Sequence, residues 1–406
     1  MVEIDGTRLL ESLHTLRAFG AAGTGVVRPT FSEADMAARR WLVDQMTAAG
    51  LAATIDGIGN VVGRSPNPGP AVLLGSHSDT QPEGGWLDGA MGVMYAIETA
   101  RALLADPATA HLAVDVAAWA DEEGTYGSAL GSHSFVGELT AADLAATNAD
   151  GETVAEALAR VGLADVERIE MQPDRHVAYL EAHIEQGPHL EASGKRVGVV
   201  TGIVGIAGAT VRFHGAQNHA GTTPMAIRKD AAAAMLEFGV RFGARFSEVA
   251  GPASVWTIGN LGVHPGAESI VPGEAWCQVQ YRDASADVMA RFDEHLMALV
   301  ADLDAEGPCA VTAERRDKGM APARMDPAIV SAIGAAAEGR APGEWVEMPS
   351  GAGHDANTFA PYLPTGMLFI PSIGGVSHDF AEDSHEDDIV LGCRVFADAV
   401  AAVLAR

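Results

Sequence analysis

The chain has 406 residues, of which 48% are hydrophobic, and a formal net charge of −28. This chain is longer than a domain with a single hydrophobic core usually is, so two domains are expected. The acidic balance argues against nucleic acid and against an anionic membrane surface as partners, because both attract Lys and Arg. The sequence contains no run of about 18 apolar residues, so no membrane span is predicted. The charged N-terminus lacks the apolar region of a signal peptide, so a cytoplasmic location is predicted.

The first part of the chain alternates between helical and strand patterns. Amphipathic patterns predict helices over 7–20 and 32–49. Apolar runs at 71–75 and 111–120 predict buried strands, with a helix over 91–104 between them. This alternation predicts an α/β layer in which a mostly parallel sheet is flanked by helices.

From about residue 206 the pattern changes. The expected elements there are four strands and two helices, at 208–215, 253–262, 275–282, 311–315, 230–246 and 287–304. They predict an α+β lid or dimerisation domain with an antiparallel sheet, spanning 207–324. It would be inserted into a catalytic domain formed by 1–206 and 325–406. The α/β pattern then resumes, with helices at 327–339 and 390–404 around a strand at 366–370.

Histidines and carboxylates gather directly after the predicted strands of the first domain. His77 and Asp79 follow one strand, and the adjacent Glu122 and Glu123 follow the next. Asp88 lies in a glycine-flanked turn before a helix. Each has an ordinary structural explanation when taken singly, such as a turn or a solvated pair. Ligands bind beyond the carboxyl ends of the strands in such sheets, and a divalent cation makes this crowding of acidic groups favourable.

Several long motifs follow one another along nearly the whole chain. They are GSHSDTQPEGGWLDGAMGV, DEEGTYGSALGS, LEAHIEQGPHLE, GAQNHAGTTPM, SGAGHDA and PSIGGVSH. Together they resemble those of the N-carbamoyl-L-amino-acid hydrolases and allantoate amidohydrolases. These belong to the aminoacylase- and carboxypeptidase-like two-metal hydrolases. HIEQGPHLE and NHAGTTPM are highly specific, whereas a lone His-x-Asp pair is not.

The resemblance implies two divalent metal ions with five protein ligands. His77 and His183 would bind one ion, Glu123 and His378 would bind the other, and Asp88 would bridge them. Zinc is the preferred expectation, and manganese, cobalt or nickel are compatible with the same His and carboxylate ligands.

Other residues of this domain take supporting or reacting roles by the same resemblance. Asp79 would orient the first histidine, and Glu122 would act as general base beside the shared water. His385 competes with His378 for the last ligand position. The SHxxxE pattern that ends at Glu382 favours His378.

The substrate side involves both domains. The resemblance implies that His219 reaches across a homodimer to stabilise an oxyanion, and that Arg282 binds the substrate carboxylate. A loop histidine that caps a helix and a strand-surface arginine are the structural alternatives. Gln186 and the backbone near Gly351 and Ala352 would hold the ureido and amino-acid ends.

Three positions depart from the family pattern. Ser269 stands where the family often has a substrate-contacting Asn, and Tyr126 and His133 lie in altered segments after the second motif. None is an expected metal ligand, so the departures bear on the substrate. The histidine at 183, and the absence of a lysine shortly after Asp88, favour an amidohydrolase over a peptidase.

The sequence therefore predicts a metal-dependent hydrolase that cleaves the carbamoyl C–N bond of N-carbamoyl-L-amino acids, small ureido carboxylates. Allantoate amidohydrolase or another ureide hydrolase is the alternative. An N-acyl amino acid amidase or dipeptidase, and a non-catalytic binding protein, are further alternatives.

Overall fold

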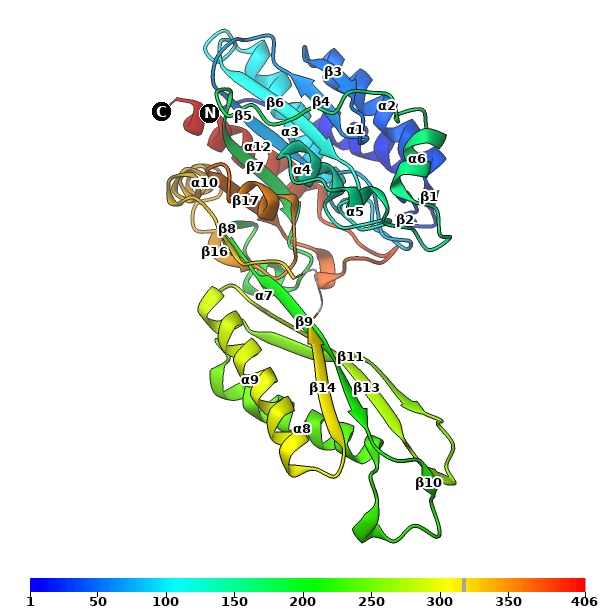
Figure 1. Cartoon of the computed structure of the whole chain (residues 1–406). Helices are drawn as coiled ribbons and strands as arrows, with labels where there is room; N and C mark the ends of the chain where they lie inside the picture. The colour runs from blue at the N-terminus through cyan, green and yellow to red at the C-terminus, as the bar shows by residue number, and fades with distance from the viewer. Residues whose placement is uncertain (316–318, 406) are drawn as a thin grey trace. The chain divides into compact units, whose positions relative to one another are not determined.

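The computed structural model describes residues 1–315 and 319–405. The chain divides into two compact units, unit 1 with Met1–Thr201 and Arg324–Arg406, and unit 2 with Gly202–Ala323 (Figure 1). The sequence-predicted boundaries lay at 206/207 and 324/325. Each unit has a hydrophobic core of its own.

Unit 1 is built on a nine-stranded mixed sheet in the order β15-β8-β17-β7-β5-β6-β4-β3, with β16 also paired to β8. The strands are β3 (Ala52–Ile55), β4 (Val61–Arg64), β5 (Ala71–His77), β6 (Ala113–Trp119), β7 (His176–Ile184), β8 (Val197–Ile203), β15 (Ala323–Arg324), β16 (Trp345–Ser350) and β17 (Thr365–Ile370). The central strands β17, β7, β5 and β6 are parallel, whereas β8 and β4 run antiparallel to them. Every residue of β5, β6 and β17 is buried, as expected where both faces of a parallel sheet are covered.

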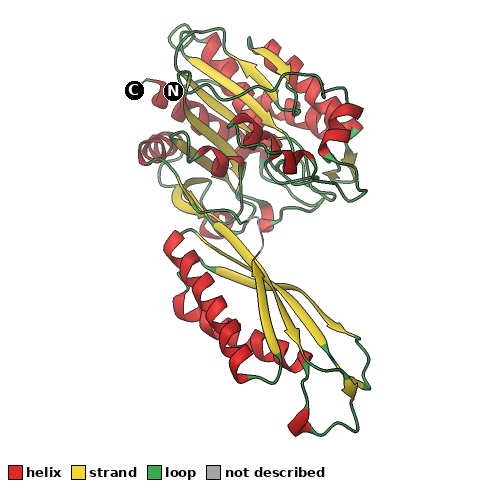
Figure 2. Cartoon of the chain, viewed as in Figure 1, coloured by secondary structure: helices red, strands yellow, loops and turns green. Residues whose placement is uncertain are grey.

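Helices cover both faces of this sheet (Figure 2). Five helices share the large core with one face, namely α1 (Gly6–Ala18), α2 (Glu33–Ala48), α3 (Ala90–Ala105), α10 (Pro327–Arg340) and α12 (Glu386–Leu404). The short helices α4 (Leu130–Phe135) and α11 (Asp355–Phe359) cover the other face. There Tyr179 stacks with Phe359, and the Trp119 ring packs at a tilt against Phe135 and Phe359. Side chains alternate between faces along a strand, so each strand contributes to both layers.

Smaller elements complete the described fold. They are β1 (Ala21–Ala22), β2 (Gly25–Val26), α5 (Ala141–Leu144), α6 (Val154–Arg160), α7 (His189–Ser193) and the 3₁₀ turns η1 (Met225–Ile227) and η2 (Ile373–Gly375). None of the helices in the described part of the chain combines the length and apolarity needed to cross a bilayer.

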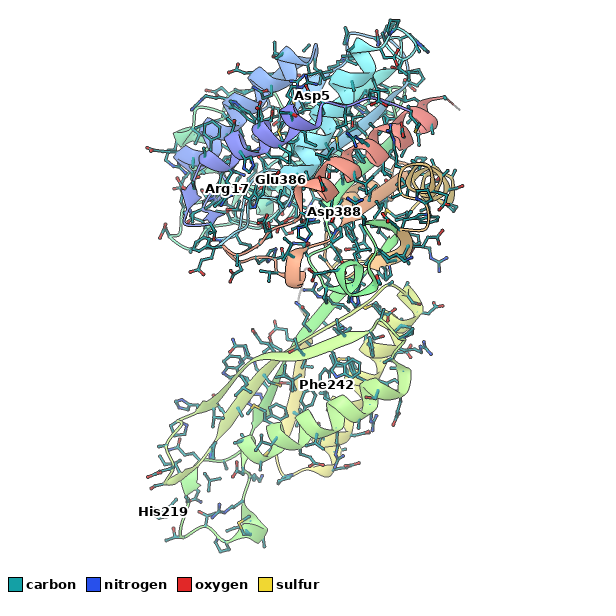
Figure 3. All side chains as sticks on the ribbon, turned by 180° about the vertical axis from the view of Figure 1, so that it is seen from behind. Asp5, Arg17, His219, Phe242, Glu386 and Asp388 are labelled. Carbon is teal, nitrogen blue, oxygen red and sulfur yellow. The ribbon has the colours of Figure 1, made fainter. Side chains whose placement is uncertain are left out.

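Unit 2 is a four-stranded antiparallel sheet in the order β11-β13-β9-β14, packed against two helices. Its elements are β9 (Gly205–His214), α8 (Ala231–Val249), β11 (Val255–His264), β13 (Glu274–Asp283), α9 (Ala286–Glu306) and β14 (Ala310–Arg315). A two-residue ladder joins β10 (Asn218–His219) to β12 (Ile270–Val271). Aromatic rings fill the core, including Phe242, labelled in Figure 3, which stacks on Phe238. The predicted α/β catalytic fold with an inserted antiparallel α+β domain is confirmed.

Candidate active site

Three neighbouring parallel strands bring the predicted residues of unit 1 to one edge of the sheet. His77 is the last residue of β5, His183 is the next-to-last of β7, and Glu122 and Glu123 follow the end of β6. Because β7, β5 and β6 are adjacent and parallel, their carboxyl ends lie together. Asp88 reaches the same edge from the loop before α3.

These side chains form two groups of metal-ligand type that share one residue. The groups are His77, Asp88 and His183, and Asp88, Glu123 and His378. Asp88 Oδ1 lies 3.0 Å from His183 Nε2 and 3.5 Å from His77 Nε2. Asp88 Oδ2 lies 3.2 Å from His378 Nε2, which is 3.6 Å from Glu123 Oε2. Each oxygen of the shared carboxylate thus faces a different group, and the donors are those that divalent transition metals take in proteins.

Electrostatic interactions within the two groups shift the pKa values of their members. Burial raises the pKa of Glu123 to about 7, helped by the nearby charge of Asp88. Burial opposes ionisation of Asp88 too, but contacts with His183, His378 and His77 hold its pKa well below the usual range. The contact with Asp88 raises the pKa of His378 to about 9. Metal ligands must be deprotonated, so a cation that binds to these side chains would compete with protons.

Glu122 lies beside the first group without belonging to either group of the described residues. Its Oε2 is 3.6 Å from His77 Nε2, and its side chain is 13% exposed. Burial raises the pKa of Glu122 well above the usual range, although the neighbouring His77 opposes this. This side chain therefore lies within reach of the first group without being one of its candidate ligands.

Asp79 supports both groups in a way that the sequence did not reveal. His77 Nδ1 lies 3.1 Å from the main-chain oxygen of Asp79 and 3.8 Å from its carboxylate Oδ1, so the hydrogen bond goes to the backbone. The other carboxylate oxygen accepts the backbone N–H of Glu123 at 3.2 Å. Gln81, which sequence reasoning missed, donates from Nε2 to Glu123 Oε2 at 2.8 Å. Gln81 lies within the first of the quoted motifs, but its residue type alone did not single it out.

Gln186 lies at the second group. Its Nε2 donates to Asp88 Oδ2 at 3.0 Å and to Ser377 Oγ at 3.1 Å, and lies 3.3 Å from His378 Nε2. Its φ of 57° places it in the left-handed region, which is uncommon for a residue other than glycine. Such strained backbone concentrates at functional sites.

The remaining predicted positions of unit 1 differ in their closeness to these groups. Gly351 and Ala352 lie in the loop after β16, and this loop meets the first group through His354, whose ring centroid is 4.6 Å from that of His183. His385 precedes α12 and belongs to neither group within the described ranges.

Two of the departures from the family pattern have structural partners of their own. The Tyr126 hydroxyl donates to Glu152 at 2.8 Å, and His133 lies on α4 with its Nε2 3.9 Å from Glu138. Neither contact involves the metal-ligand groups.

Within unit 2, His219 and Ser269 lie together and Arg282 lies far from them. Ala220 N–H donates to the carbonyl of Ser269 at 2.9 Å, beside the ladder that contains His219. Figure 3 shows His219 at the tip of this unit. Arg282 pairs with Ile206 at the other end of β13.

The loop around His219 also fixes its ring. Nδ1 accepts the backbone N–H groups of Gly221 at 3.0 Å and Thr222 at 3.2 Å. A ring nitrogen that accepts hydrogen bonds carries no proton, so the proton of the neutral ring is on Nε2. His219 is therefore set up as a donor through Nε2.

Comparisons with known proteins agree with this geometry. Residues 73–402 match the family model of Peptidase family M20/M25/M40. The crystal structure of an amidase of the hydantoinase/carbamoylase family from Burkholderia phymatum is 48% identical, with a TM-score of 0.94 over 100% of this chain and 99% of that chain. The N-carbamoyl-L-amino acid amidohydrolase of Geobacillus stearothermophilus is 34% identical over 98% of each chain. The allantoate amidohydrolase of Escherichia coli K12 is 32% identical over 95% of each chain.

The matched range includes both metal-ligand groups and the whole of unit 2. The resemblance noted from the motifs is confirmed, as is the expectation of a metal-dependent hydrolase. The chain belongs to peptidase family M20/M25/M40 and, with these relatives, to its carbamoylase and allantoate amidohydrolase branch of metal-dependent hydrolases.

Proposed function

We propose that this protein is a two-metal amidohydrolase that cleaves the carbamoyl C–N bond of N-carbamoyl-L-amino acids. The observation that carries the proposal is the shared carboxylate of Asp88, with one oxygen facing each metal-ligand group. Water adds to the carbamoyl carbon and the bond to the amino nitrogen breaks. The products are the amino acid and carbamate, which decomposes to ammonia and carbon dioxide.

The side chains present fit two divalent cations, with zinc preferred and manganese, cobalt or nickel compatible. His77 and His183 would hold one ion, Glu123 and His378 the other, and Asp88 both. When bound, such a pair lowers the pKa of a shared water and polarises the carbamoyl oxygen.

The protein's own groups then move protons and orient the substrate. Glu122 takes a proton from the attacking water and returns it to the leaving amino nitrogen. His219 donates from Nε2 to the oxygen that becomes negative at the tetrahedral stage. Arg282 pairs with the substrate carboxylate through its planar guanidinium, and the Gln186 amide binds the ureido end. Ser269, and the backbone at Gly351 and Ala352, complete the contacts.

The second candidate is hydrolysis of allantoate or another ureide. Allantoate is also a ureido carboxylate, and the Escherichia coli relative is nearly as similar as the Geobacillus stearothermophilus one. An N-acyl amino acid amidase or a dipeptidase remains a less favoured alternative. A non-catalytic role is disfavoured because every expected ligand position and Glu122 retain the required side chains.

We also propose a homodimer formed through unit 2. Leu236 and Val240 lie one helical turn apart on α8 and are 68% and 73% exposed. Val255 and Leu261 are exposed on β11, the edge strand of the sheet. An apolar stripe beside an open strand edge is a liability for a monomer and suits a self-complementary contact.

The distance between two residues of unit 2 supports a site shared by two copies. Eight residue steps of β13 separate Glu274, which pairs with His214, from Arg282. This length is roughly 26 Å, and His219 lies beyond the Glu274 end. A small ureido acid cannot touch His219 and Arg282 of the same copy. We therefore assign the two contacts to different copies.

The test of the reaction is ammonia release by purified, metal-loaded protein from N-carbamoyl-L-amino acids and from allantoate in parallel. Turnover of a carbamoyl amino acid that disappears with a chelator supports the proposal. Turnover of allantoate alone supports the second candidate function, with the same type of hydrolysis. If neither substrate is turned over, both candidate functions are refuted, and N-acyl substrates should be tested next.

The test of the shared site is a mixture of two inactive variants, His219→Ala and Glu122→Gln. In a mixed dimer, one site has an intact Glu122 from one copy and an intact His219 from the other. Random pairing places such a site in half of the dimers, so about a quarter of the wild-type activity is expected after subunit exchange. A mixture as inactive as its parents would refute the assignment.

A further inference from the structure

Glu382 is a buried carboxylate that connects two loops near the second metal-ligand group. It is 1% exposed. Its Oε1 accepts the backbone N–H groups of Leu87 at 3.2 Å and Asp88 at 3.0 Å. Its Oε2 accepts the Ser377 hydroxyl at 2.8 Å. One side chain therefore ties the loop before α3 to the segment after η2.

Both tied segments carry ligands of the second group. Asp88 is the shared ligand, and Ser377 directly precedes His378. The φ of His378 is 53°, in the left-handed region that costs a non-glycine residue free energy. The segment around His378 is irregular, so its conformation must be held by contacts from elsewhere.

Close packing restricts the Glu382 side chain to a single position. A Cβ atom at Gly85 would overlap the carboxyl group and the Cβ of Glu382, so glycine is required where the loop passes. One residue further, Trp86 Nε1 donates to Asp383 Oδ1 at 3.3 Å. The two segments thus meet along consecutive residues, with Glu382 at the centre.

We propose that Glu382 is a positioning residue that holds Asp88 and His378 in the arrangement needed to bind a metal ion at the Asp88–Glu123–His378 group. The proposal rests on the two-metal function proposed above. Glu382 belongs to neither ligand group of the described residues, and acts through the backbone of residues 87 and 88 and the hydroxyl of Ser377.

The effect is greater at the second group because the two groups are supported differently. His77 and His183 lie within strands β5 and β7, and their side chains are 2% and 1% exposed. His378 lies on an irregular segment, and its side chain is 49% exposed. Loss of Glu382 therefore loosens His378 and the orientation of Asp88 but leaves the strand-borne histidines in place.

The experiment is a competition titration of metal-free full-length protein with Zn²⁺ against a chelator, which resolves the affinities of two sites. Glu382→Ala should weaken the second site about 10- to 100-fold, the usual effect of removing a residue that supports ligands. Glu382→Gln should stay within a few-fold of wild type. Its amide oxygen can accept the two backbone N–H groups while its NH₂ donates to Ser377 Oγ.

Glu98→Ala is the matched control. Glu98 is a buried carboxylate on α3, 2% exposed, that accepts hydrogen bonds from Arg8 and from the backbone of Asp5. Its loss should lower thermal stability and leave both zinc affinities unchanged. Ser377→Ala, which removes one of the three donors, provides a milder variant, with a smaller weakening that is again greater at the second site.

The outcomes separate this proposal from the proposed function. Two wild-type sites with selective weakening in Glu382→Ala and Ser377→Ala, and recovery in Glu382→Gln, support it. If Glu382→Ala and Ser377→Ala both keep the wild-type zinc affinities, or weaken both sites equally, this proposal is overturned while the two-metal function stays intact. A wild-type protein that does not bind two zinc ions overturns the proposed function and this inference with it.

Discussion

Replacing Glu122 with Gln is expected to remove catalysis while leaving metal binding intact. Gln has almost the same shape, and Glu122 lies outside both ligand groups of the described residues, 3.6 Å from His77 Nε2. The change therefore removes the proton acceptor and little else. A positioned general base contributes about 10²- to 10⁴-fold, so kcat should fall by this factor, equivalent to about 2.7–5.4 kcal/mol of barrier.

The neighbouring residue provides the comparison. Glu123→Gln replaces a carboxylate that faces His378 at 3.6 Å, so this variant should lose metal from the second group as well as activity. The assay is ammonia release, together with metal content after gel filtration. If Glu122→Gln keeps more than a few per cent of the wild-type kcat, or loses metal as Glu123→Gln does, the role assigned to Glu122 is refuted.

Three further predictions concern substrate, metal and stability. Arg282→Lys should raise KM about tenfold or more with metal content unchanged, because Lys cannot make a two-pronged contact with a carboxylate; an unchanged KM would remove Arg282 from that role. Asp88→Ala should lose both metal ions and His378→Ala only one, as measured by metal content, since only Asp88 belongs to both groups; equal losses would contradict the shared ligand. Burial by itself would raise the pKa of Asp115, but hydrogen bonds from Arg175 at 2.6 and 2.7 Å outweigh it and lower this pKa to about 2. A lowered folded-state pKa gives stability that is present above the unfolded pKa near 4 and is lost as pH falls towards 2. Asp115→Asn should therefore cost about 3 kcal/mol in urea denaturation at pH 7 and less at pH 3; an equal cost at both pH values would argue against the ion pair.

The fold could be predicted where one physical signal dominates. The apolar runs that became β5, β6 and β17 are buried on both sides, and such strands give continuous hydrophobic stretches. Strand β7 escaped prediction because buried polar residues, among them Glu181 and His183, interrupt its apolar pattern. Strands β3 and β4 are only four residues long, too short for a periodic signal.

In the site, too, some features could be predicted from the sequence and others could not. The candidate ligands could be named for two reasons. Side chains of metal-binding type follow the predicted strands, and the motifs resemble those of a two-metal family. The hydrogen bonds that support these ligands could not be predicted from residue type. Gln81 and Glu382 act through hydrogen bonds with residues 42 and 294 positions away. Asp79 works through its carbonyl oxygen as well as its carboxylate, and a main-chain atom leaves no mark on residue type.

Unit 2 shows why strand register matters for the function. The sequence places His219 and Arg282 in one small domain, and only the resemblance to the family implied that His219 acts across a homodimer. The antiparallel pairing of β9 with β13 sets them at opposite ends of a ten-residue strand. If both residues contact the substrate, one of them must come from a second copy. An assembly is then part of the catalytic apparatus, and a variant that stays monomeric should lose activity even with both metal ions in place.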